Sequence, residues 1–323
     1  MCIMEEFEKI KTKVEYQGYY YKISEIIKIV ILGLLCTQKT MKEIQSWAKS
    51  NRISKLLLEK FCIKKIPCYS HFTVLVSMID SEELNKIFME FFRKLVESVV
   101  GKTIAIDGKT VCSTANISKY RSPLHIASAF VVENGITIGQ LAAEGKGKEI
   151  PCVQELIRLL DIEGAIVVTD ETAKEILTAG ADYVFSVKKN QKQLYADVAE
   201  MIDFKLTDKY ELLNAPLAKV TKSEKSHGRI DKRTAFVTHE VEWLQKFGKW
   251  HGIQSLGAIA TDSETRYYIS SRMLSPTELL QITRNEWAVE SMHWQLDVIF
   301  NEDRTTLHEE NAQKTLNILR KTV

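Results

Sequence analysis

Three acidic residues stand where carboxylates could share divalent metal ions. Asp107 and Asp170 each end a short apolar segment with the character of a β-strand, and Glu290 lies in a long helical segment. Oxygen ligands of this kind suit hard cations such as Mg²⁺ or Mn²⁺. Two such ions, about 3.5–4 Å apart and bridged by one carboxylate, can activate water and stabilise the leaving oxygen of a phosphodiester. The candidate chemistry is therefore metal-dependent phosphodiester cleavage, with Asp107 as the bridging ligand.

Each of these acids also has an ordinary structural interpretation. An Asp at the end of a strand is often a turn or helix-cap residue, and a Glu on an amphipathic helix usually faces solvent. The predicted elements around them favour the chemical interpretation. From Gly101 the apolar pattern changes from helical periodicity to alternation, and the expected order is three strands followed by helix, strand, helix, strand. These elements cover residues 103–107, 124–132, 135–142, 151–160, 165–170, 171–179 and 182–187.

This order is that of an RNase H-like domain, an α/β (α+β) fold. Asn134-Gly135 between two apolar runs is a strong hairpin signal and predicts that the second and third strands pair. Such a fold places acidic residues on the first strand, the fourth strand and the last helix, where this chain carries Asp107, Asp170 and Glu290. Residues at about 190–270 do not fit the pattern and are predicted to be an insertion.

The last helical segment, residues 276–300, carries further polar and aromatic side chains. Trp287, Glu290, Trp294 and Asp297 follow one another at helical spacing and share one stripe. For the Trp pair, packing into the core is favoured over stacking on nucleic-acid bases. His293 and Asp297 are four residues apart, a spacing typical of a contact on the helix surface.

Residues 1–100 are predicted to be helical throughout. Thr40 and Glu43 form a capping-box pattern, and Ile66-Pro67 interrupts the helical periodicity. Short helices around such a turn suit a DNA-binding bundle and suit a packing or dimerisation module equally well. The sequence therefore predicts two domains, a helical one over residues 1–100 and an RNase H-like one with its insertion over residues 101–323.

Composition narrows the class of protein. The 323 residues include 44 basic and 42 acidic side chains, a net charge of +2 that by itself points to no partner. Six cysteines occur without a CxxC pair or a metal-ligand rhythm, which is typical of reduced thiols. No secretory signal or membrane-spanning segment is recognisable, so a cytoplasmic protein with no membrane partner is expected, in the bacterial cytosol.

Two basic stretches could meet a phosphate backbone. Lys189 and Asn190 follow the fifth predicted strand, and Arg229 lies in a basic segment that extends to Arg233. Ordinary exposed loops have the same composition, so both interpretations stay open at this level.

The motifs in this order resemble those of the H-repeat-associated (ISAs-type) insertion-sequence transposases of the DDE superfamily. The matching stretches are residues 104–109 (IAIDGK), 164–170 (GAIVVTD), 180–185 (GADYVF), 189–191 (KNQ), 227–229 (HGR) and 287–298 (WAVESMHWQLDV). The resemblance implies that Asp107, Asp170 and Glu290 are a catalytic and metal-binding triad with two Mg²⁺ (or Mn²⁺) ions. It also implies a homo-oligomer that cuts DNA at terminal inverted repeats and joins the ends to target DNA. DNA contacts are then expected from Lys109, Lys189, Asn190, His227 and Arg229.

Three departures from the family pattern keep two alternatives open. The segment after Asp170 is shorter than in relatives, Glu286 stands where they tend to carry His, and the chain stops at Val323 where they usually continue. A catalytically decayed or truncated copy that only binds DNA is one alternative. A nuclease on the same fold is the other, because the carboxylates alone do not distinguish hydrolysis from strand transfer.

Overall fold

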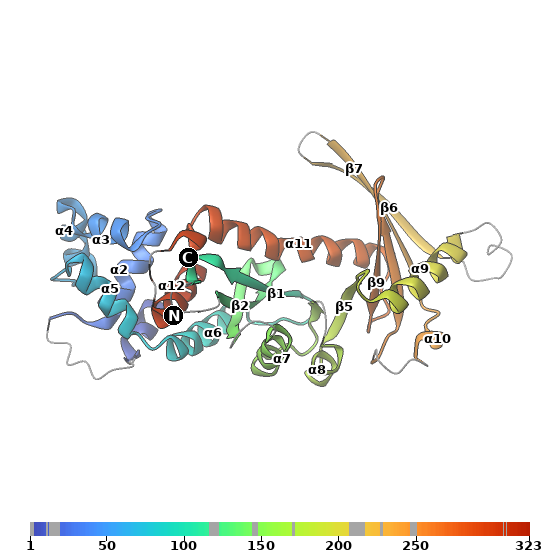
Figure 1. Cartoon of the computed structure of the whole chain (residues 1–323), viewed down its shortest axis with the longest axis horizontal. Coiled ribbons are helices and arrows are strands. Elements are labelled where there is room, and N and C mark those ends of the chain that lie inside the picture. Colours follow the sequence, from blue (N-terminus) through green and yellow to red (C-terminus); the bar gives the residue numbers. More distant parts are fainter. Residues whose placement is uncertain are drawn as a thin grey trace.

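The structure is a computed structural model, and it describes residues 3–10, 12, 20–115, 123–143, 148–169, 172–206, 217–226, 229–245, 251–305, 307 and 309–323. The molecule is elongated, with helices of the N-terminal segment at one end and the last strands of a large sheet at the other (Figure 1). Among the described residues, no helix combines the length and the apolar character that a membrane span requires.

Short helices fill the N-terminal segment, as the periodicity predicts. They are α1 (Ile3–Glu6), η1 (Phe7–Lys9), α2 (Ile23–Leu35), α3 (Met41–Lys49), α4 (Asn51–Phe61), α5 (Tyr69–Met78) and α6 (Ser81–Val96). The predicted capping box begins α3: Thr40 Oγ1 accepts the backbone N–H of Glu43 at 3.1 Å, and the Glu43 carboxylate accepts that of Thr40 at 2.9 Å. The apolar stripe of α2, which includes Ile27 and Val30, is fully buried at the centre of this layer.

The first five strands have the RNase H-like order that the sequence predicts. They are β1 (Thr103–Val111), β2 (Leu124–Val131), β3 (Ile136–Ala143), β4 (Ile166–Val168) and β5 (Asp182–Val187), with the short turns η2 (Cys112–Thr114) and η4 (Val132–Asn134). Their order in the sheet is β3-β2-β1-β4-β5. β1, β2 and β3 pair antiparallel, and β4 and β5 run parallel to β1. Gly135 closes the predicted β2–β3 hairpin at a φ of 66°, a conformation that favours glycine.

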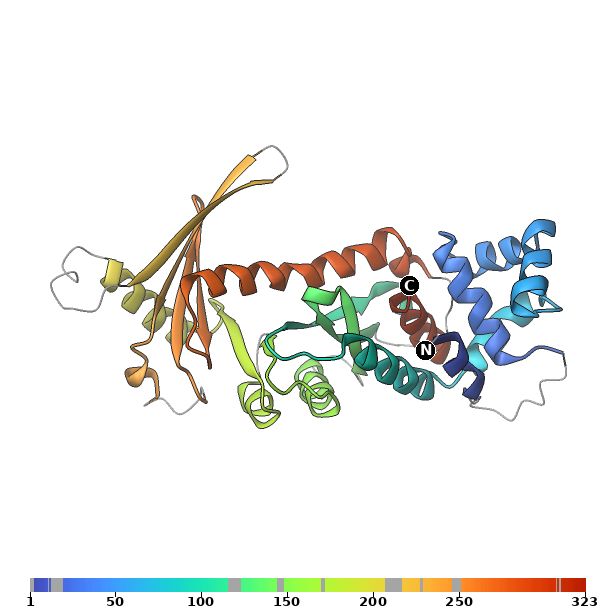
Figure 2. The ribbon, with the colours of Figure 1, turned by 180° about the vertical axis from the view of Figure 1, so that it is seen from behind.

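Helices cover both faces of this sheet. α7 (Glu149–Leu159) and α8 (Ala173–Thr178) lie on the same side as α6, and α11 (Pro276–Val298) crosses the opposite side (Figures 1 and 2). α11 begins at a second capping box, formed by Ser275 and Glu278. Its apolar residues Val289, Met292 and Leu296 pack into one buried cluster with Ala105 of β1.

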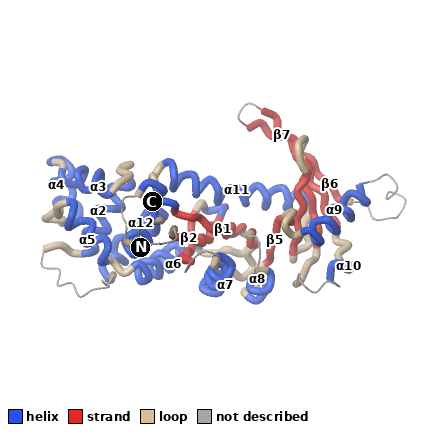
Figure 3. The backbone as a smooth tube through the Cα atoms, in the orientation of Figure 1, coloured by secondary structure: helices blue, strands red, loops and turns tan. Residues whose placement is uncertain are grey.

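The predicted insertion between β5 and α11 is confirmed, and it extends the same sheet. It contains α9 (Lys192–Leu206), β6 (Ala218–Ser226), β7 (Arg229–Thr238), α10 (Glu242–Gln245), β8 (Ser255–Ala260) and β9 (Thr265–Ser270). β9 pairs antiparallel with β5, so the sheet continues as β9-β8-β7-β6 to nine strands. The far end of the β6–β7 hairpin projects beyond the other strands as an arm (Figure 3).

The last helix returns to the N-terminal layer. After η6 (Glu302–Arg304), α12 (Glu310–Lys321) inserts Leu316 and Leu319 into the core formed by α2, α5 and α6. The Asn311 side chain joins the α5–α6 connection, because it donates to the Ser77 carbonyl at 2.8 Å and accepts from the Ser81 N–H at 3.3 Å. The core of the N-terminal helices therefore contains residues from both ends of the chain.

Candidate active site

Asp107 is the first exposed residue of β1. The four residues before it, Thr103 to Ile106, are buried in the sheet, whereas the Asp107 side chain is 49% exposed. One carboxylate oxygen accepts the Gly108 backbone N–H at 2.8 Å, and the other lies 3.6 Å from Nδ1 of His293 on α11. The carboxylate is therefore oriented by two neighbours and remains open to a ligand.

Asp107 and Glu290 line the same cleft. This cleft, with a volume of about 420 Å³, lies beside the middle of β1, where β4 ends, and residues of both α7 and α11 line it. Glu290 is exposed on α11, one helical turn before His293. The fold thus brings two of the three predicted metal ligands to one cavity from elements far apart in the sequence.

The third predicted ligand, Asp170, lies outside the described residues. Its strand, β4, is placed next to β1 by parallel pairing, with Val168 opposite Ala105. Thr169 and Thr172, on either side of Asp170 in the sequence, both line the cleft.

The described side chains fit a hard cation by chemistry, but they do not form a complete metal site. No group of three His, Cys, Asp or Glu residues within the described ranges is arranged to hold a metal ion. Asp107 and Glu290 supply carboxylate oxygens, which Mg²⁺ and Mn²⁺ prefer. A triad would need the carboxylate of Asp170 in addition.

The cleft also contains acids that the sequence did not single out as ligands. Glu149, at the start of α7, and Glu286, one turn before Glu290, both line it. Oε1 of Glu149 lies 3.6 Å from Nε2 of His125 on β2. An acid in the first turn of a helix is common, so the sequence around Glu149 carried no signal of its position.

Gly108 has a steric reason to be glycine. A Cβ at this position would lie 2.4 Å from Nε2 of His125, well inside contact distance. Nδ1 of His125 is held in turn at 2.9 Å from Oγ1 of Thr110. The absence of a side chain at Gly108 lets the imidazole pack directly against β1 beside Asp107.

Lys109 was expected to contact DNA, but in the structure its side chain forms ion pairs with carboxylates of the same chain. Its side chain is only 10% exposed, and its ammonium lies 2.7 Å from Asp297, 3.1 Å from Glu302 and 3.7 Å from Asp303. Burial opposes the charged form, but these carboxylates outweigh it and raise the pKa of Lys109 above its ordinary value. The contacts favour an internal role over a phosphate contact.

The other expected DNA contacts fall in two places. Asn190 lines the cleft and Lys189 is exposed beside it, in the turn that follows β5. Arg229 begins β7 opposite Ser226 in the hairpin arm, and only its backbone is described. His227 lies outside the described residues. The structure thus brings Asn190 to the cleft with Asp107 and Glu290, and it places Arg229 on a separate element.

The prediction that Trp287 and Trp294 pack in the core is wrong. Their exposed fractions are 48% and 59%. The apolar stripe of Val289, Met292 and Leu296 faces the sheet, so these two side chains lie on other sides of α11. The Arg266 guanidinium instead lies over the ring of Trp287, with its Cζ 5.4 Å from the ring centroid.

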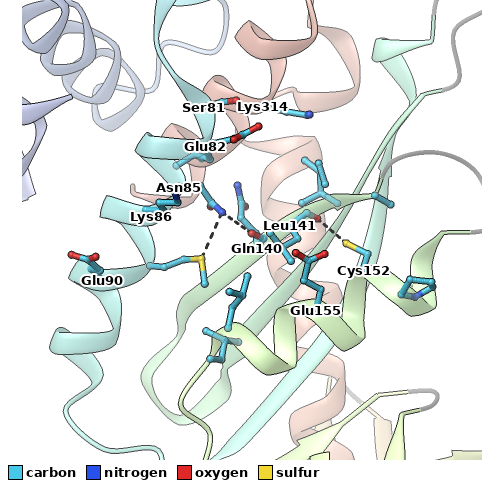
Figure 4. Close-up of a pocket in the computed structure, with 18 of the residues that line it drawn as sticks. Ser81, Glu82, Asn85, Lys86, Glu90, Gln140, Leu141, Cys152, Glu155 and Lys314 are labelled. Atoms are coloured by element: carbon cyan, nitrogen blue, oxygen red, sulfur yellow. Dashed lines mark hydrogen bonds between the residues drawn. The ribbon is translucent and has the colours of Figure 1, made fainter. Parts of the chain in front are cut away.

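A larger cavity, of about 850 Å³, lies between α6, β3 and α7 (Figure 4). Asn85 donates to the Gln140 carbonyl at 2.8 Å, and the Cys152 thiol donates to the Leu141 carbonyl at 3.5 Å. Burial raises the pKa of Cys152, so this thiol is a poor nucleophile. Neither Asp107 nor Glu290 lines this cavity, and the candidate active site is the smaller cleft.

The strand predicted to end at Asp107 continues to Val111, so this carboxylate lies in the middle of β1. The sheet order, together with carboxylates on its first strand and on the helix α11, defines the RNase H-like class of metal-dependent phosphoryl-transfer domains. The chain belongs to the family described as transposase DDE domain, whose model matches residues 100–323. A second model, DDE_Tnp_1-associated, matches residues 4–92. The protein is thus an H-repeat-associated DDE transposase, a class whose general activity is DNA cleavage and strand transfer and whose domain implies the use of a divalent metal ion.

The chain is similar to two relatives over most of its length. It is 30% identical over 320 residues to "Putative protein YbfL" of Escherichia coli (strain K12). It is 29% identical over 320 residues to "H repeat-associated putative transposase YhhI" of the same strain. Each alignment covers 93% of this chain and 83% of the relative. Among solved structures, the piggyBac transposase in a synaptic complex with hairpin DNA has a similar fold, with a TM-score of 0.53 at 10% identity over 99% of this chain and 68% of that one.

Proposed function

We propose that Asp107, Asp170 and Glu290 are the catalytic triad of this transposase and hold two Mg²⁺ (or Mn²⁺) ions. The observation that carries the proposal is that Asp107 of β1 and Glu290 of α11 line one cleft. Thr169, the residue before Asp170 in the sequence, lines the same cleft. Asp107 would be the bridging ligand, because β1 contacts both β4, the strand before Asp170, and α11, the helix that carries Glu290. Metal ions held by these carboxylates would supply activation of a water molecule and stabilisation of the leaving oxygen of a phosphodiester.

Neighbouring residues of the chain orient the proposed metal ligands. The Gly108 N–H and His293 hold the two oxygens of Asp107, which leaves their remaining lone pairs directed outward. Glu290 faces the cleft from the opposite wall, so a scissile phosphate would lie between the sheet and α11. Fixed carboxylates in this geometry require little reorganisation when the transition state forms.

The substrate in this proposal is DNA, at the terminal inverted repeats of the element and then at a target site. Lys189 and Asn190 at the cleft, and the arm that carries His227 and Arg229, would contact phosphates. Three lysines on the arm strands are exposed and support this placement: Lys219, Lys222 and Lys232. Residues 1–100 would recognise DNA and residues 101–323 would catalyse.

Two further expectations belong to this proposal. A homo-oligomer would pair the two ends of the element, because each end must be cut and joined at one target. The protein would act in the bacterial cytoplasm, where its DNA substrate lies.

The test is nicking of DNA that carries the flanking end sequences of the element, in Mg²⁺ or Mn²⁺. Cleavage by the wild type that is lost in Asp107→Asn and Glu290→Gln would support the triad, because these changes remove charge but little volume. Cleavage that survives Asp107→Asn would overturn the assignment. DNA binding without any cleavage by the wild type would identify a copy that only binds DNA. Cleavage without joining to a target would identify a nuclease.

A further inference from the structure

Alternate residues of strand β1 contact successive turns of helix α11. Ala105 packs with the Val289–Leu296 face of the helix, Asp107 lies 3.6 Å from His293, and Lys109 lies 2.7 Å from Asp297. Alternate residues of a strand are about 6.7 Å apart on one face, and residues four apart on a helix are about 6 Å apart along its axis. Because these two repeats nearly coincide, each pair supports the alignment set by the others.

The Lys109 end of this alignment is fixed by a buried charge cluster. Glu302 is fully buried, and its two oxygens divide the contacts: Oε2 lies 3.1 Å from the Lys109 ammonium, and Oε1 accepts from Asn317 at 2.7 Å. Arg320 lies 3.7 Å from the same Oε1. The ammonium of Lys109 thus joins β1 to the end of α11 and, through Glu302, to α12.

We infer that Lys109 is a positioning residue, whose contacts with Asp297 and Glu302 hold α11 in register on β1 and so hold Glu290 opposite Asp107. This inference rests on the proposed function, since it concerns the spacing of two proposed metal ligands. A slip of one helical turn would move Glu290 by about 5.4 Å, more than the separation of two bridged ions. Misplacement by about 1 Å can already lower a reaction rate about 100-fold.

If Lys109 contacted DNA directly, neutralising its acidic partner Asp297 would not have the effect of removing Lys109. Asp297 carries a negative charge and would repel a phosphate, so its neutralisation would leave DNA binding unchanged or strengthen it. If Lys109 positions α11, removing either side of the 2.7 Å contact slows cleavage, and removing both slows it by less than the two separate effects combined. A double-mutant cycle therefore separates the two roles.

The experiment compares Lys109→Met, Asp297→Asn and the double variant. For each, cleavage is measured at saturating DNA, the DNA Kd is measured as a function of salt, and Mn²⁺ binding is measured without DNA by the EPR signal of free Mn²⁺. We expect each single variant to cleave about 100-fold more slowly, with a Kd for DNA within about threefold of wild type. Mn²⁺ affinity should fall about tenfold in each, and the losses in the double variant should be smaller than those of the two single variants combined.

Two controls keep loss of folding apart from loss of position. Lys109→Met leaves Glu302 buried with Arg320 still beside it, so Lys109→Arg, which keeps a positive charge at this position, should fold and recover part of the lost rate. Lys174→Met changes an exposed lysine of α8 and should match wild type in all three measurements. Thermal unfolding followed by circular dichroism verifies the folded state of every variant.

The inference is overturned if Lys109→Met weakens DNA binding, lowers the salt dependence by about one phosphate contact, and leaves cleavage at saturating DNA unchanged. It is also overturned if folded Asp297→Asn behaves as wild type. Failure of the proposed function looks different: Mn²⁺ binding and cleavage would then be absent from the wild type itself, or unaffected by Asp107→Asn.

Discussion

Nδ1 of His293 lies 3.6 Å from Oδ2 of Asp107, and the imidazole is largely buried between α11 and the sheet. Burial lowers the pKa of His293 more than the Asp107 charge raises it. The ring is therefore neutral near pH 7 and acts as a polar neighbour, not a counter-ion.

The two glutamates of α11 that line the cleft are expected to differ in importance. Glu290→Gln should lower cleavage at least about 1000-fold, because it removes a proposed metal ligand. Glu286→Gln should lower it less than about tenfold, because Glu286 lies one helical turn before Glu290 and is not a proposed metal ligand. Single-turnover cleavage assays with both variants check this. Equal losses in the two would show that the glutamate ligand is wrongly assigned.

Gly108→Ala should disturb the site through His125. The new Cβ would lie 2.4 Å from Nε2 of the imidazole, and overpacking of this kind costs about 1–3 kcal/mol. His125→Ala removes the obstacle, so the double variant should regain stability relative to Gly108→Ala alone. Urea unfolding of the three variants measures this recovery. A Gly108→Ala protein as stable as wild type would mean that β1 and the imidazole separate at little cost.

The C-terminal Lys321 should make stability depend on pH in the alkaline range. Burial lowers its pKa to about 8, and its ammonium donates to Oγ of Ser128 at 2.6 Å. Between about pH 8 and 10.5 the unfolded chain binds this proton more tightly than the folded one, so the contribution of Lys321 to stability rises with pH in that window and is unfavourable below it.

Lys321→Met should therefore stabilise the protein at pH 7, by up to about 3 kcal/mol, and this gain should shrink as the pH approaches 10. Denaturant unfolding at pH 7, 8.5 and 10 measures the difference from wild type, and Lys174→Met serves as the control. A difference that stays constant over this range would show that the folded protein does not shift the pKa of Lys321.

Leu319→Ala should destabilise the N-terminal helices although it lies near the other end of the chain. Leu319 is fully buried among α2, α5 and α6, and removing such a side chain costs about 2–5 kcal/mol. Leu35→Ala, at a side chain that is 56% exposed, should change stability by less than about 0.5 kcal/mol. Hydrogen exchange of α2 amides in the two variants reads out the local effect. Unchanged exchange in Leu319→Ala would contradict a shared core.

Local signals in the sequence predicted much of the fold. Alternation and the Asn134-Gly135 turn predicted the β2–β3 hairpin, and Thr40 with Glu43 predicted the start of α3. Helical periodicity predicted the helices of residues 1–100. These signals are local because capping, turn conformation and helical spacing involve residues only a few positions apart.

The sequence by itself determined the order of the strands and helices along the chain, and it predicted the carboxylates Asp107 and Glu290, which line one cleft in the structure. The tertiary structure alone decided how α11 sits on β1. That alignment buries Lys109 against Asp297 and leaves Trp287 exposed. The packing of α7 against the sheet, in turn, adds Glu149 to the cleft. Helical periodicity defines stripes on a helix, but contacts with distant elements decide which stripe is buried, and these depend on side-chain packing across the whole fold.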